Sequence, residues 1–94
     1  MIEVYHKNDP TFRDVHEEVV DLSEFTKVAI VRCGALRDAF RLTNHIDEPW
    51  FDNEEVEVIK RNARSSSVGD LFHEVEPDNW FICQSIGWHL INVQ

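Results

Sequence analysis

The segment from Asn79 to Gln94 contains no Asp, Glu, Lys or Arg, although the whole chain carries 18 acidic and 9 basic residues. Charged side chains are rarely buried without a partner, so a charge-free segment that opens with Trp80, Phe81 and Ile82 is typical of the interior of a sheet. We therefore predict that this segment supplies interior strands and that the rest of the chain is arranged around them.

A hairpin is predicted where the chain enters this segment. Residues Asp70–Glu76 and Trp80–Ile86 have strand-like composition and flank a turn at Pro77-Asp78-Asn79. Trp88–Val93, which follows Gly87, predicts the last strand. Alternation places Leu71, His73 and Val75 on one face of the first strand and Phe72, Glu74 and Glu76 on the other.

Earlier elements are predicted from their periodicity. Met1–Tyr5 predicts a strand, and Lys27–Cys33 is apolar on both faces, as an interior strand is. Ala35–Ile46 predicts the main amphipathic helix, and Thr11–Leu22 predicts a second, short helix. The apolar stripe of the main helix comprises Leu36, Ala39, Phe40, Thr43 and Ile46.

These elements indicate one α+β domain over residues 1–94. We expect a mixed or antiparallel sheet of about four or five strands, with the helix 35–46 packed on one face. The N-terminal residues lack an apolar signal region, and the longest aliphatic run, residues 28–31, is too short to span a bilayer. The expectation is a soluble, intracellular protein.

The net charge of −9 constrains the partners of the chain. It argues against direct binding of nucleic-acid phosphates, which requires Lys and Arg, and against docking on an anionic membrane. Two interpretations remain. The acids form a solvated surface that keeps the protein soluble, or they form a face that meets a basic partner or imitates a phosphate backbone.

The densest acidic segment, 47–57, is the candidate protein-binding site, because six of its eleven residues are acids and Trp50 and Phe51 lie among them. Aromatic side chains often dominate the energetics of an interface. The alternative is that Trp50 folds back over the core beside Pro49. The predicted contact residues are Asp47, Glu48, Trp50, Phe51, Asp52, Glu54 and Glu55.

A basic and serine-rich segment follows. Lys60, Arg61 and Arg64 either neutralise the acidic segment or form a small phosphate-binding patch. Ser65–Asp70 is typical of a structural turn, although backbone N–H groups beside an arginine can also cradle an anion.

We expect no catalytic residue, metal site or cofactor. The histidines show no zinc-ligand spacing and no Cys-x-x-Cys companion; they are His6, His16, His45, His73 and His89. Cys33 and Cys83 are predicted to be buried free thiols. Cys83 could meet His73 or His89 across strands, but such neighbours occur without catalysis.

Three motifs carry a family resemblance: AFRLTNHID with PW at residues 39–50, RSSSVGD at residues 64–70, and Gly87-Trp88. The chain from about Ala39 onward resembles small proteins encoded by mycobacteriophages and actinobacterial mobile elements. The resemblance implies a non-catalytic phage accessory protein in the host cytoplasm. Such a protein would bind and disable a host bacterial protein, and so alter host physiology or exclude competing phages. The alternative is an acidic DNA mimic that occupies a host nucleic-acid-binding enzyme.

Overall fold

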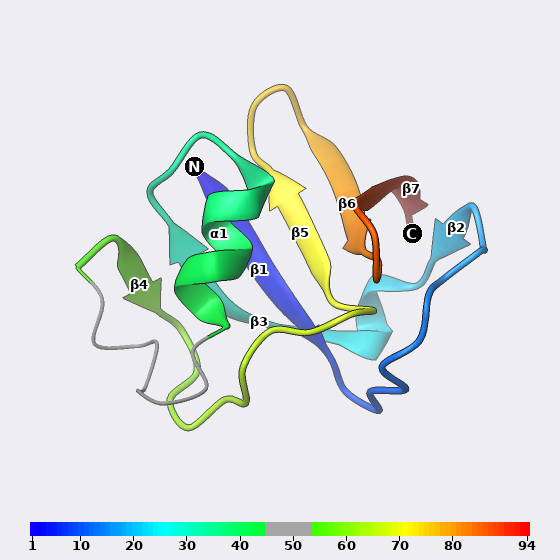
Figure 1. Cartoon of the computed structure of the whole chain (residues 1–94), viewed down its shortest axis with the longest axis horizontal. Helices are drawn as coiled ribbons and strands as arrows, with labels where there is room; N and C mark the ends of the chain where they lie inside the picture. The colour runs from blue at the N-terminus through cyan, green and yellow to red at the C-terminus, as the bar shows by residue number, and fades with distance from the viewer. Residues whose placement is uncertain (45–53) are drawn as a thin grey trace.

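The computed structural model describes residues 1–44 and 54–94, which form one α-helix, a 3₁₀ turn and one mixed sheet (Figure 1). The α+β prediction is therefore confirmed. The elements are β1 (Ile2–Lys7), β2 (Val19–Val20), η1 (Leu22–Glu24), β3 (Phe25–Val31), α1 (Leu36–Thr43), β4 (Val56–Val58), β5 (Leu71–Glu74), β6 (Asn79–Cys83) and β7 (Trp88–Val93).

The sheet has seven strands in the order β2-β7-β6-β5-β1-β3-β4 within the described part of the chain. The β2–β7 pair is parallel and the other pairs are antiparallel. The prediction of four or five strands is wrong because β2 and β4 contain two and three residues. Segments this short show no measurable alternation, so only their pairing with a longer strand identifies them.

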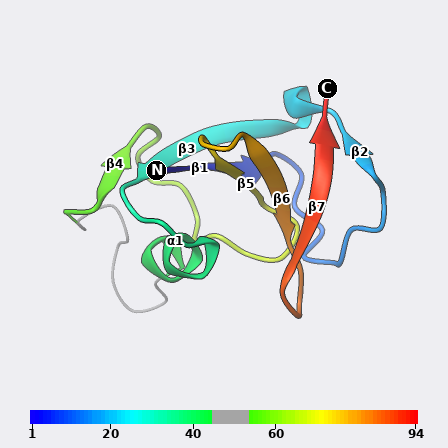
Figure 2. The same ribbon diagram turned by 90° about the horizontal axis from the view of Figure 1, so that it is seen from above.

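Helix α1 covers one face of the sheet (Figure 2). Ala39 and Leu42 are buried there against a core that includes Val4, Val28 and Phe72. The helix is shorter than the predicted 35–46: it begins at Leu36, and by Asn44 the backbone has left the helical region. Residues 45 and 46 of the predicted helix lie outside the described residues.

The opposite face carries a second core of Phe25, Leu71, Ile82 and Ile91. The hairpin prediction is confirmed in its pairing and its faces, because Leu71 pairs with Ile82 and Phe72 with Phe81. Side chains from the segment before β3, including Val15 and Leu22, pack on this second core.

The predicted helix at Thr11–Leu22 is wrong. This segment runs as extended chain with the short strand β2, and its contacts come from residues far away in the sequence. The side-chain amide of Gln84 accepts from the Val15 N–H and donates to the Val15 carbonyl, at 3.0 and 2.7 Å. Helical spacing of Val15, Val19 and Leu22 was therefore misleading, since Val19 is exposed while Val15 packs on the second core.

The charge-free tail lies less deep than predicted. Strands β6 and β7 each have a neighbour on both sides, but β5 is the central strand and β7 has only the two-residue β2 beyond it. Ile86 is 93% exposed and Leu90 is 61% exposed. An absence of charge thus indicated strands without indicating their depth. No helix within the described residues is long and apolar enough to cross a membrane.

Replacing Gln84 with Ala should release the segment before β2. Two hydrogen bonds to Val15 would be lost, so we expect the free energy of unfolding to fall by about 1–2 kcal/mol and the Val15 amide to exchange faster. Urea denaturation and hydrogen exchange measure the two effects. Asn92→Ala is the matched control, because Asn92 is an exposed residue of β7. Equal losses in both variants would contradict this role for Gln84.

Candidate functional site

The carboxylate of Asp70 is the centre of the most buried polar cluster in the described chain, and the residue is 0% exposed. Both terminal nitrogens of Arg64 donate to it, each at 2.7 Å to a different oxygen. The backbone N–H groups of Ser67 and Lys7 also donate to it, at 2.8 and 2.9 Å. The anion cradle considered for residues 65–70 therefore exists, and the anion in it is the chain's own Asp70.

A second buried hydrogen-bond chain runs beside this ion pair. The Thr43 hydroxyl donates to the Ala39 carbonyl at 2.8 Å, and the Ser66 hydroxyl donates to Thr43 at 2.7 Å. Because each hydroxyl has one proton, the 2.9 Å contact between His6 Nε2 and Ser66 must be a donation from the imidazole. This direction is opposite to that of a general base, which would accept the serine proton.

His6 is neutral at physiological pH. The pKa of its imidazole is lowered from the ordinary 6.5 to about 4, chiefly by burial; Asp70 acts to raise it, and Arg64 and Lys60 act to lower it. A neutral ring agrees with the geometry, since Nε2 lies 3.9 Å from an Asp70 oxygen, beyond hydrogen-bond distance.

A third cluster lies on the face opposite α1. His73 contacts Glu3 through Nδ1 and Asp78 through Nε2, and its ring stacks on Trp80 at 3.8 Å between centroids. Burial raises the pKa of Glu3, but hydrogen bonds from Lys27 and His73 outweigh burial and lower it. Since each ring nitrogen is engaged with a carboxylate, neither is directed at a metal or substrate site within the described residues.

The described residues contain no group of three or more His, Cys, Asp or Glu side chains placed to hold a metal ion. Cys83 is buried at the end of β6, and Cys33 is half-buried after β3. Burial raises the pKa of both thiols, that of Cys83 to about 11, which disfavours the reactive thiolate. Cys83 pairs with Trp88, whereas His89 is opposite Ile82 on the other face, so the considered Cys–His pair does not form.

Most of the predicted contact residues lie outside the described residues: Asp47, Glu48, Trp50, Phe51 and Asp52. Glu54 and Glu55 are described, and both are exposed just before β4. Arg32 donates from Nη1 to the Glu54 carbonyl at 3.1 Å and from its backbone N–H to the Glu55 carbonyl at 2.9 Å. Both carboxylates are thus left available to solvent or to a partner.

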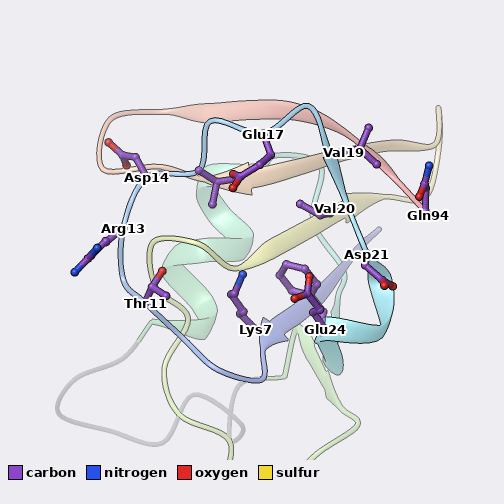
Figure 3. Close-up of a pocket in the computed structure, with 12 residues that line it drawn as sticks. Lys7, Thr11, Arg13, Asp14, Glu17, Val19, Val20, Asp21, Glu24 and Gln94 are labelled. Atoms are coloured by element: carbon purple, nitrogen blue, oxygen red, sulfur yellow. The ribbon is translucent and has the colours of Figure 1, made fainter.

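Sequence reasoning missed a cleft of about 500 Å³ beside the end of β1, between the segment before β2 and the segment leading into β3 (Figure 3). Val15, Val20 and Phe25 give it an apolar lining. The charged residues around it are Asp14, Glu17, Asp21, Glu24, Lys7 and Arg13. The available signal was the acidic run from Asp14 to Glu24, which the helix prediction treated as a solvated face.

The carboxylates around the cleft differ in their bonding. Asp14 accepts from Ser85, and Asp21 accepts from Ser23, and these hydrogen bonds lower the pKa of both acids. Glu17 and Glu24 have no side-chain hydrogen bond or ion pair within the described residues. The Lys7 ammonium lies 5.6 Å from the centroid of the Phe25 ring, so a cation already occupies part of the cleft.

Comparison of the chain with protein-family models, with curated proteins and with solved structures gives no match.

The Asp70→Asn variant should lose much of its stability. The change would leave the Arg64 guanidinium without its partner charge in a site that is partly shielded from water. We expect a fall of roughly 3 kcal/mol in the free energy of unfolding, measured by urea denaturation. Asp38→Asn is the control, because its 3.9 Å pair with Arg41 is exposed and should be worth less than about 0.5 kcal/mol. Similar losses in both variants would refute the central role of Asp70.

His6 should make stability depend on pH. Between pH 6.5 and about 4 the unfolded chain binds a proton at this imidazole and the folded protein does not, so acidification favours unfolding. Above pH 6.5 the free energy of unfolding is unaffected by protonation of His6. Between pH 6.5 and pH 4 it falls by about 3 kcal/mol because of the proton that only the unfolded chain binds. His6→Gln keeps a donor for Ser66 and should flatten this part of the profile, whereas the exposed His16→Gln should not. Identical profiles for His6→Gln and the parent chain would rule out the assignment.

Proposed function

We propose that this chain is a non-catalytic phage accessory protein that binds a basic surface of a host bacterial protein, with the cleft between Asp14 and Glu24 as the contact. The observation that carries the proposal is the placement of Glu17 and Glu24, two carboxylates without partners in the described chain, beside an apolar lining. The phage setting and the host cytoplasm follow from the motif resemblance.

The cleft suits a lysine or arginine side chain of a partner. Such a side chain buries its aliphatic stem on apolar surface and keeps its charged end near polar groups. Val15, Val20 and Phe25 would receive the stem, and Glu17 and Glu24 would meet the cation. The position of Lys7 over Phe25 supports this, because it is the same kind of contact made within the chain.

A binding role is also supported by the way the chain uses its reactive groups. The His6 imidazole donates a hydrogen bond to Ser66, and both ring nitrogens of His73 contact carboxylates. The Cys83 thiol is buried with a raised pKa. Both histidines thus link segments of the fold, and the exposed carboxylates are the groups that we propose meet a partner.

DNA mimicry is the weaker alternative. A mimic needs its carboxylates on one continuous face. The acids near β2 and those near β4 lie at opposite ends of the strand order, separated by the five other strands. Asp70 is buried in its own ion pair, and so adds nothing to a surface.

Reversing the charge of the cleft should abolish recognition. The partner is first isolated from the lysate of an actinobacterial host and identified, and its Kd is then measured for the parent chain and for Glu17→Lys/Glu24→Lys. Like charges at an interface cost several kcal/mol, so we expect Kd to rise at least about tenfold.

The matched control is Glu54→Lys/Glu55→Lys, which makes the same charge change at the exposed acids before β4. If only this control weakened binding, the contact would be the acidic segment 47–57 and the cleft proposal would be wrong. If neither variant changed Kd, carboxylate recognition itself would be refuted. Release of the partner by duplex DNA would favour the mimic.

A further inference from the structure

A second, smaller hollow of about 190 Å³ lies where three segments meet. Its walls come from the end of β1 with Asn8, from the start of β3, and from residues 60–64. Of the nine residues that line it, none is Asp or Glu, although the chain has twice as many acidic as basic residues. The hollow is therefore distinct in charge from the cleft, where acids outnumber bases.

Three cationic residues line the hollow, Lys7, Lys60 and Arg64, and the charge of Arg64 is balanced by its ion pair with Asp70. The Lys60 ammonium has no hydrogen bond or ion pair within the described residues, so its three donors are available. The ion pair with Asp70 fixes the position of the Arg64 guanidinium. Arg64 and Lys60 both act to lower the pKa of His6, another residue that lines the hollow, although burial lowers it most and Asp70 raises it.

Polar side chains surround these cations. Asn62 comes from the same segment as Lys60, and Asn8 and Thr26 face each other across β1 and β3, with the Thr26 hydroxyl donating to the Asn8 carbonyl oxygen. That oxygen is occupied and the amide nitrogen donates to the Ser23 carbonyl at 3.4 Å, so one of its two N–H groups is left to donate. The available donors therefore lie on two of the three walls: Lys60 and Asn62 on one, and Asn8 on another.

We propose that the hollow bounded by Lys60, Asn62, Asn8 and Arg64 binds a single phosphate group, either the free ion or one carried by a small molecule. Its volume is below the roughly 300–1,000 Å³ typical of sites that enclose a drug-sized ligand, so only the phosphate itself would be enclosed. This site does not depend on the protein-binding role of the cleft, and either one can fail without the other.

Titration of the full chain with inorganic phosphate at constant ionic strength, followed by amide chemical shifts, tests the proposal. We expect saturable shifts confined to residues 6–8, 26–28 and 60–64, and no such shifts with chloride. Lys60→Gln should raise the Kd for phosphate by about fivefold, the effect of one unit charge at about 4 Å in water.

Arg61→Gln is the matched control, because Arg61 carries the same charge in the adjacent position, is exposed and does not line the hollow. Its Kd should change by less than about twofold, as expected for a charge beyond contact distance in salt. Equal effects of both substitutions, equal shifts with chloride, or shifts that do not saturate would each overturn the site. A nucleoside monophosphate that binds more tightly than phosphate would identify a phosphorylated small molecule as the ligand, and equal affinity would identify the free ion.

Discussion

The rest of the structure depends on one buried carboxylate. Asp70 accepts hydrogen bonds from both terminal nitrogens of Arg64, from the N–H and the hydroxyl of Ser67, and from the backbone of Lys7 at the end of β1. A buried charge is costly unless it is paired and fully bonded, so these donors must be in place whenever the sheet is folded. The hydrogen bonds to Asp70 connect the segment after β4 to the end of β1. The hydrogen-bond chain of His6 and the walls of the smaller hollow lie next to this carboxylate.

The two buried histidines show how the fold assigns a role to each polar group. His6 is inside the cluster beside Asp70 and stays neutral, because burial and neighbouring cations oppose protonation. His73 lies on the other face, where its two ring nitrogens contact Glu3 and Asp78. Each ring joins segments that are distant in sequence. Residue types that suggest catalysis in a sequence thus serve here to hold strands together.

The surface separates two kinds of charge on opposite sides of the end of β1. The cleft beside Phe25 is rich in carboxylates, and the hollow beside Lys60 has none. Lys7 contributes to both. An overall charge of −9 would hide the second site completely, because net charge averages over faces that a ligand meets separately. The two proposed sites therefore differ in local charge, one complementary to a basic protein surface and the other to a phosphate.

Local patterns in the sequence predicted the strands and the helix whose buried side chains recur at a regular spacing along the chain. Trp88–Val93, the β5–β6 hairpin and most of helix α1 follow from alternation, turn residues and an apolar stripe. Features whose partners are distant in sequence were found only in the tertiary structure. They are the segment before β2, which Gln84 holds, and the hydrogen bond from the Lys7 N–H to Asp70. The cleft and the hollow belong to this second group, since each is walled by segments that meet only when the strands are ordered. Periodicity records which face of an element is buried, and it carries no information about which other element lies against that face.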